Sequence, residues 1–167
     1  MGKPPFERIV SVHGAVVLRV CHAVLGAHDA EDAWSETFLS ALKAYPDLPE
    51  DARVQAWLIT IAHRKAIDIL RTRQRQALPM DDLPPRESPL GIPGGGHPEV
   101  LDAVGQLPPK QRQAVAYHYL AGLPYKDVSE LLGVTPEAAR RAGADGVKAL
   151  RAALADTSSP ASKGTSR

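Results

Sequence analysis

The chain has 167 residues and a net charge of +1, with two Trp, two Phe and four Tyr, so one domain or two small ones must build their cores from Leu, Val, Ile and Ala. The lone cysteine, Cys21, excludes an intramolecular disulfide, fits a reducing compartment and is expected to be buried. The sequence has no signal-peptide cleavage pattern and no run judged long and apolar enough to span a membrane, so a cytoplasmic protein is expected.

Two helices are predicted at the start of the chain. Apolar positions favour a helix over residues 5–26, which ends at Gly26. Asp29 is the predicted N-cap of the next helix, which has one apolar face and ends at Tyr45-Pro46. The acidic side chains of this second helix lie away from its apolar face.

A third, long helix is predicted from about Ala52 to Gln74, after a polar loop over residues 46–52. Residues 51–76 hold six Lys or Arg against two Asp. This segment is therefore the candidate electrostatic footprint for nucleic acid, although a solvated helix face would have the same charge.

A Pro- and Gly-rich linker over residues 77–98 divides the chain, because helical periodicity stops there. Further helices are predicted over residues 99–156, and the Ser- and Thr-rich tail 157–167 is expected to be disordered. The prediction is an all-α fold with two small helical domains joined by a flexible linker. His and Cys residues are scattered without metal-ligand spacing, and no phosphate loop or nucleophile motif is present, so neither an enzyme, a metal site nor a cofactor is expected.

Residues 122–151 predict two helices joined by a tight turn. Gly133 suits the left-handed backbone at the end of the first helix. Thr135 can cap the second helix, with Pro136 at its first position and Glu137 near its positive end. The pattern favours a helix-turn-helix DNA reader over an ordinary helical hairpin in a core.

Three segments in register resemble bacterial RNA polymerase sigma factors of the extracytoplasmic-function type. They are DAEDAWSETFLSAL from Asp29, AWLITIAHRKAIDILR from Ala56, and LPPKQRQAVAYHYLAGLPYKDVSELLGVTPEAAR from Leu107. The resemblance implies a three-helix sigma region 2 over residues 1–76 and a helix-turn-helix sigma region 4 over residues 99–156. It further implies binding to core polymerase, through its beta-prime clamp helices and beta flap, and to promoter DNA. An anti-sigma factor is a further candidate partner, and no small-molecule substrate is implied.

The resemblance also implies roles for particular residues. Polymerase binding falls on the second helix, at Asp29, Glu31, Asp32, Ser35 and Glu36. Minus-ten DNA binding falls on the basic third helix and its start, at Arg53, Arg64, Lys65, Arg71, Arg73 and Arg75. Minus-thirty-five DNA binding falls on the recognition helix, at Thr135, Glu137, Ala138, Arg140, Arg141 and Lys148. Trp57 could stack on a base, but its apolar neighbours at i−3 and i+4 favour a place in the core.

The recognition helix departs from the family pattern. Gly143 and Gly146 interrupt it at a cost of about 1 kcal/mol each relative to alanine, and Asp145 would repel phosphate. Residues 99–156 hold seven Lys or Arg and seven Asp or Glu. Weak minus-thirty-five binding is therefore expected, unless the glycines allow close packing against a neighbour. A sigma-like interaction protein that reads promoters poorly is the alternative function, and a stand-alone repressor would leave the first unit unexplained.

Overall fold

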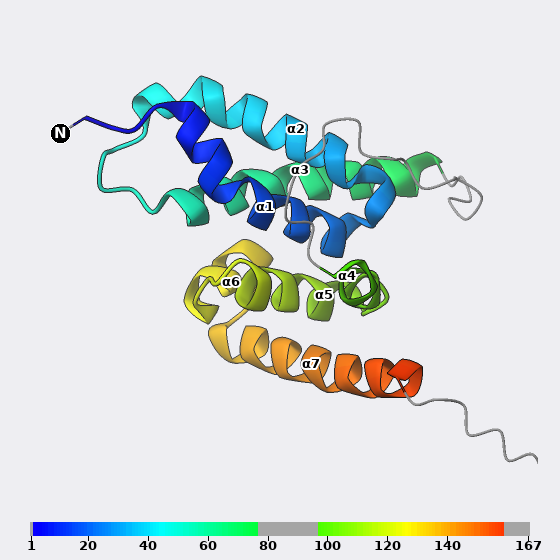
Figure 1. Cartoon of the computed structure of the whole chain (residues 1–167). Coiled ribbons are helices and arrows are strands. Elements are labelled where there is room, and N and C mark those ends of the chain that lie inside the picture. Colours follow the sequence, from blue (N-terminus) through cyan, green and yellow to red (C-terminus); the bar gives the residue numbers. More distant parts are fainter. Residues whose placement is uncertain (1, 77–96, 159–167) are drawn as a thin grey trace, which may run out of the picture.

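The computed structural model describes residues 2–76 and 97–158, which contain seven α helices and no strand. Figure 1 shows them in three layers. The first unit, residues 2–76, forms one layer from α1 (Phe6–Leu25), α2 (Ala27–Ala44) and α3 (Val54–Gln76). The second unit, residues 97–158, forms the other two, and α7 is the outermost helix. The all-α fold is confirmed.

The first unit packs α1 against both α2 and α3. Gly14 brings α1 close to Trp34 of α2, because a Cβ at residue 14 would already lie 3.5 Å from the indole ring. The indole Nε1 donates a hydrogen bond to the Gly14 carbonyl at 2.8 Å. Val17 and Ala33 are fully buried beside this contact. Cys21 is buried as expected, and burial raises the pKa of its thiol to about 12.

Helix α1 corrects one expectation, because by length and composition it is able to cross a membrane. Its apolar residues are explained by the fold. The helix is covered by α2 and α3 on one side and by α4 and α5 of the second unit on the other. Almost half of its apolar window is buried in these contacts, as in the core helix of a globular protein.

Two helix boundaries also differ from the predictions. Gly26, with φ of 90°, is the N-cap of α2, so Asp29 lies inside the first turn of that helix and is not its cap. Its carboxylate pairs instead with Arg73 near the end of α3. Helix α3 begins at Val54, after the short 3₁₀ helix η1 (Tyr45–Asp47), and extends to Gln76.

The second unit contains α4 (Pro98–Gly105), α5 (Pro109–Val115), a π-helical turn η2 (Ala116–Leu120), α6 (Tyr125–Leu132) and α7 (Pro136–Ser158). Residues Pro109 to Leu120 therefore form one continuous helix that widens at η2. Helix α7 runs two residues past the predicted domain end, and the rest of the tail and residues 77–96 of the linker lie outside the described residues.

The helix-turn-helix forms as its local sequence predicts. Gly133 ends α6 with φ of 67°, in the left-handed region. The Thr135 hydroxyl accepts a hydrogen bond from the Ala138 N–H at 3.1 Å and so caps α7. Ala139 is fully buried between the two helices.

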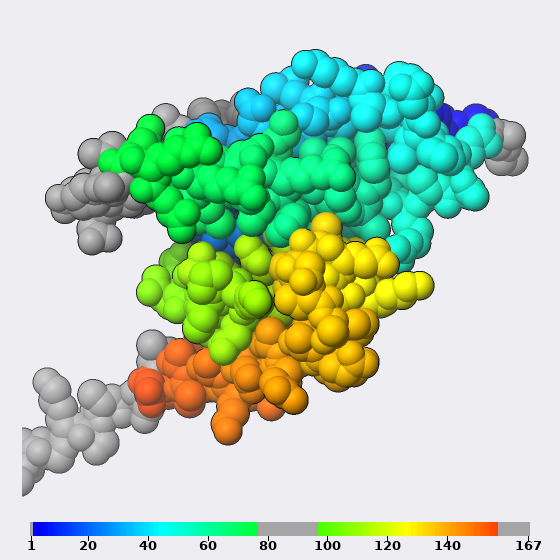
Figure 2. Space-filling view, turned by 180° about the vertical axis from the view of Figure 1, so that it is seen from behind, coloured from blue at the N-terminus to red at the C-terminus, as the bar shows by residue number. Residues whose placement is uncertain are grey.

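The two units pack directly on one another. Leu101 and Val104 of α4 and Tyr117 of η2 join the residues of α1 in a single buried cluster. In Figure 2, α6 lies directly against the face of α3. The side of α3 that faces α6 is therefore partly covered by the second unit.

Candidate nucleic-acid and polymerase interface

The outer face of α2 combines carboxylates with apolar side chains. Asp32 and Glu36 are exposed one turn apart, and Ser35 and Glu31 are half-buried beside them. Leu39 follows on the same face and is 55% exposed. This face of α2 therefore presents carboxylates and an exposed leucine side by side. Asp29 differs from the other four predicted residues, because its half-buried carboxylate is engaged by Arg73.

The basic residues of α3 divide into two groups. Arg64, Arg71 and Arg75 are exposed, and Lys65 is half-buried. The guanidinium of Arg73 is instead turned inward, where it donates to the Asp29 carboxylate and to the Leu25 carbonyl at 2.8 Å. Arg73 thus joins α3 to the junction of α1 and α2, while the first group remains accessible to phosphates.

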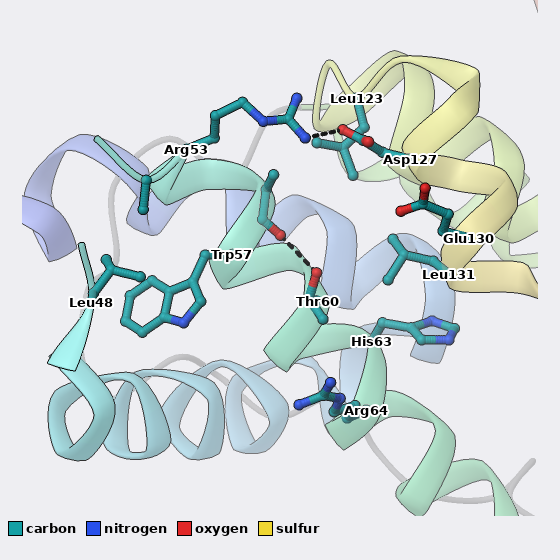
Figure 3. A pocket seen from close by; sticks show the side chains of 12 residues that line it. Leu48, Arg53, Trp57, Thr60, His63, Arg64, Leu123, Asp127, Glu130 and Leu131 are labelled. Carbon is teal, nitrogen blue, oxygen red and sulfur yellow. Dashed lines mark hydrogen bonds and ion pairs between the residues drawn. The ribbon is translucent and has the colours of Figure 1, made fainter. Parts of the chain in front are cut away.

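A cavity of about 530 Å³ lies beside the contact of α3 with α6 and is lined by residues of both helices. Figure 3 shows Trp57, Thr60 and His63 on its α3 side, with Asp127 and Leu131 on its α6 side. Trp57 is partly buried, with its ring centroid 6.4 Å from that of Tyr45, so it is part of the packing but still lines the cavity. Of the predicted minus-ten residues, Arg53 and Arg64 line this cavity.

Polar contacts hold the two units together around this cavity. Arg53 forms an ion pair with Asp127 of α6 at 2.5 Å (Figure 3). The Gln55 amide donates a hydrogen bond to the Ala121 carbonyl at 2.5 Å. His63 and Tyr117 share a hydrogen bond of 2.6 Å between Nδ1 and the hydroxyl. Of the side chains in these contacts, only Arg53 belongs to the predicted minus-ten set.

The contact between His63 and Tyr117 joins a half-buried side chain to a buried one, which disfavours charge on either. Tyr117 is fully buried, and burial raises the pKa of its hydroxyl well above the usual range. Burial also lowers the pKa of His63 below 6.5, with the nearby charge of Arg64 as a smaller cause. Neutral His63 therefore suits the closed arrangement of the units.

Tyr117 and Tyr119 both lie in the π-helical turn η2, a kind of turn that often marks functional sites. Tyr117 points into the interface between the units, whereas Tyr119, two residues later, is 54% exposed. The two tyrosines therefore lie on opposite sides of the helix, as residues two positions apart do.

The recognition helix α7 has its outer face open. Its buried side is formed by Ala139, Gly143, Gly146 and Leu150, and the helix packs against α4, α5 and α6. The predicted minus-thirty-five residues are all exposed, at Thr135, Glu137, Ala138, Arg140, Arg141 and Lys148. Asp145 is exposed as well. Thr135 uses its hydroxyl for the helix cap.

An aromatic group beside α7 was not identified from the sequence. The His118 ring stacks on Tyr125 at 3.8 Å between centroids, and the Arg140 guanidinium carbon lies 5.7 Å from the centroid of the same tyrosine. The run AYHYL carries a signal, since it places three polar aromatic side chains shortly before the helix-turn-helix. The sequence does not predict the contact of His118 with Tyr125, because the two residues belong to different helical elements joined by a turn.

Two family models match the chain, one for each unit. The model described as Sigma-70 region 2 matches residues 9–76. The model described as Sigma-70, region 4 matches residues 97–150. The two spans follow the division of the chain into α1–α3 and α4–α7, and together they cover well over half of it.

Two relatives of this chain are named as RNA polymerase sigma factors. The chain is 29% identical over 136 residues to the RNA polymerase sigma factor CarQ of Myxococcus xanthus, covering 76% of this chain and 75% of CarQ. It is 30% identical over 171 residues to the ECF RNA polymerase sigma factor SigE of Mycolicibacterium smegmatis, covering 93% of this chain and 64% of SigE. The chain thus spans less than two thirds of SigE.

Solved structures share the fold at low sequence identity. The sigma factor RpoE, solved in complex with the anti-sigma factor NepR from Bartonella quintana, matches with a TM-score of 0.72 at 16% identity, over 90% of this chain and 96% of RpoE. CnrH, solved with the cytosolic domain of CnrY, matches with a TM-score of 0.62 at 21% identity, over 92% of this chain and 89% of CnrH. Both support the arrangement of helices described above.

Proposed function

The chain belongs to the sigma-70 family of RNA polymerase sigma factors, in its extracytoplasmic-function group, and from this we propose that it binds core polymerase, recognises promoter DNA and enables transcription initiation in the cytoplasm. The observation that carries the proposal is the pairing, in one chain, of an acidic and apolar α2 face with a capped recognition helix whose outer face is open. A sigma factor needs both surfaces, and it needs no catalytic chemistry of its own.

We assign polymerase binding to the outer face of α2. Asp32, Ser35 and Glu36 offer acceptors to basic residues of the beta-prime clamp helices, and Leu39 adds apolar area beside them. In a protein interface, buried apolar area adds affinity, while charges set partner choice and association rate. Asp29 acts within the first unit, because its carboxylate is held by Arg73. The second unit would contact the beta flap.

We assign promoter opening to the exposed cations of α3. Arg64, Arg71 and Arg75, with the half-buried Lys65, follow one another along the helix and suit a row of backbone phosphates. Arg53 would join them once it leaves Asp127. Separation of α6 from α3 therefore precedes minus-ten binding, and polymerase supplies the binding energy for it by holding each unit at a different place.

We assign minus-thirty-five recognition to the start of α7. Arg141 lies about 200° around the helix from the buried Ala139, so it points away from the core and toward the groove. Lys148 lies two turns further along the same outer side. Asp145 between them reduces phosphate attraction, so this contact is expected to add modestly to an affinity that polymerase dominates.

We also propose an anti-sigma factor as a regulatory partner. RpoE was solved in complex with the anti-sigma factor NepR, and CnrH with the cytosolic domain of CnrY. In this chain, the α3–α6 cavity and the α2 face are the surfaces that an inhibitor would have to cover to block DNA and polymerase.

Run-off transcription with purified bacterial core polymerase tests the proposed function. The chain is added to core enzyme with a library of genomic fragments, and transcripts are sequenced at their 5′ ends. Transcripts that start at a few shared positions and require the chain support the proposal. Stable binding to core enzyme without such transcripts would favour the interaction protein that lacks promoter reading.

A further inference from the structure

Tyr125 links the two helices of the helix-turn-helix through its ring. It is the first residue of α6, yet its ring lies within 5.7 Å of the Arg140 guanidinium on α7. A cation at this distance is attracted by the quadrupole of the ring. His118 stacks on the same ring with its plane at 16°, so Tyr125 is held by a second aromatic contact. The ring is therefore a fixed support beside Arg140.

Gly143 supplies the room for this ring. A Cβ at residue 143 would collide with the Tyr125 hydroxyl and lie 3.1 and 3.2 Å from ring carbons Cε1 and Cζ. Gly143 has an ordinary helical backbone, so its lack of a side chain rather than a special conformation is what the structure uses. The glycine that interrupts the recognition helix thus leaves the space that the Tyr125 ring occupies.

The position of Arg140 on α7 indicates what it can reach. It lies about 100° around the helix from the buried Ala139, on the flank where α6 approaches, whereas Arg141 points outward. In a helix-turn-helix the first helix crosses the DNA backbone and the second enters the groove. A residue on the flank next to the first helix is therefore closer to phosphates than to base edges.

We propose that Tyr125, packed against Gly143, positions Arg140 to bind a phosphate of the promoter backbone, and that Arg141 reads the bases. This rests on the proposed function, because it assumes that α7 enters the minus-thirty-five groove. A guanidinium held against a ring keeps its N–H fork free for a bidentate contact with phosphate. Tyr125 is a positioning residue in this assignment, since it acts through Arg140.

The hydroxyl of Tyr125 is compatible with a nearby phosphate. Burial, followed by a hydrogen bond with Tyr119, raises the pKa of Tyr125 to about 12. The hydroxyl therefore stays neutral at physiological pH and adds no negative charge beside the DNA. The positive charge of Arg140 nearby opposes this rise in pKa, because it favours the phenolate.

The test measures the affinity of the full-length chain in holoenzyme for DNA fragments selected from a pool with a randomised minus-thirty-five segment, over a series of salt concentrations. Arg140→Ala and Tyr125→Ala are each expected to weaken binding about two- to fivefold for every fragment. Arg140→Ala is also expected to reduce the salt slope by about one. Arg141→Ala should instead relax the preference at one base position.

A double-mutant cycle separates positioning from a general structural role. Adding Tyr125→Ala to Arg140→Ala should cause no further loss, and Tyr125→Phe, which keeps the ring, should bind like the wild type. Gly143→Ala should resemble Tyr125→Ala, with circular dichroism and core-polymerase binding as the controls for folding. Additive losses in the double variant, or a loss for Arg140→Ala confined to particular base sequences, would overturn the proposal. Failure of the wild-type holoenzyme to select any DNA would refute the proposed function instead.

Discussion

Replacing Gly146 by alanine sets two effects on α7 against each other. Helix propensity alone favours alanine by about 1 kcal/mol. In the structure, however, the new Cβ would lie 2.6 Å from Val115 Cγ2, 3.3 Å from the Gln111 carbonyl oxygen and 3.4 Å from Leu107 Cδ1. Val115 is buried and β-branched, and the carbonyl belongs to the backbone of α5, so neither can yield without moving that helix. Overpacking costs about 1–3 kcal/mol. The expected result is a net destabilisation of about 1 kcal/mol.

Urea unfolding followed by circular dichroism measures this difference, with Ala149→Gly as the matched control. Ala149 is exposed on the same helix, so its change to glycine should cost about 1 kcal/mol by propensity alone. Both variants should thus be less stable than the wild type, for opposite reasons. A gain of about 1 kcal/mol for Gly146→Ala would refute the close contact of α5 with α7.

Three further predictions concern the two units. Unfolding stability should decrease as pH falls below 6.5, because the pKa of His63 is lowered in the folded protein and the unfolded chain takes up the proton first; a His63→Gln variant should lose this part of the pH dependence, and an unchanged profile would contradict it. Glu36→Lys should weaken binding to core polymerase in a pull-down, whereas Glu7→Lys on α1 should leave it unchanged; equal effects would argue against the α2 face. Changing Arg64, Lys65 and Arg71 together to alanine should reduce open-complex formation more than polymerase binding. Equal loss of both would contradict the minus-ten assignment.

The helix-turn-helix could be predicted because its determinants are local. The left-handed backbone at Gly133 and the Thr135 cap each depend on a few neighbouring residues, so residue type and spacing were sufficient. The same reasoning placed Asp29 wrongly, since Gly26 already separates α1 from α2. A capping residue and an ion-pairing residue have the same side chain, and the choice depended on Arg73, more than forty residues away along the chain.

The packing of the two units could not be read from the sequence. It depends on pairs such as His63 with Tyr117 and Gln55 with Ala121, which are separated by 54 and 66 positions along the chain and leave no periodic signal. Gly143 shows the same limit. Propensity marks it as a weak point of α7, and the structure explains it by the ring of Tyr125, which another helix supplies.

Promoter opening by the reconstituted holoenzyme tests the central claim most directly, because it requires polymerase binding and strand separation by the same chain. Permanganate detects unpaired thymines upstream of the start sites found by run-off transcription. We predict reactive thymines around the minus-ten element with core polymerase and the chain together, and none with core polymerase alone. Duplex DNA that remains unreactive while the chain is stably bound to polymerase would contradict the assignment of this protein as an initiating sigma factor.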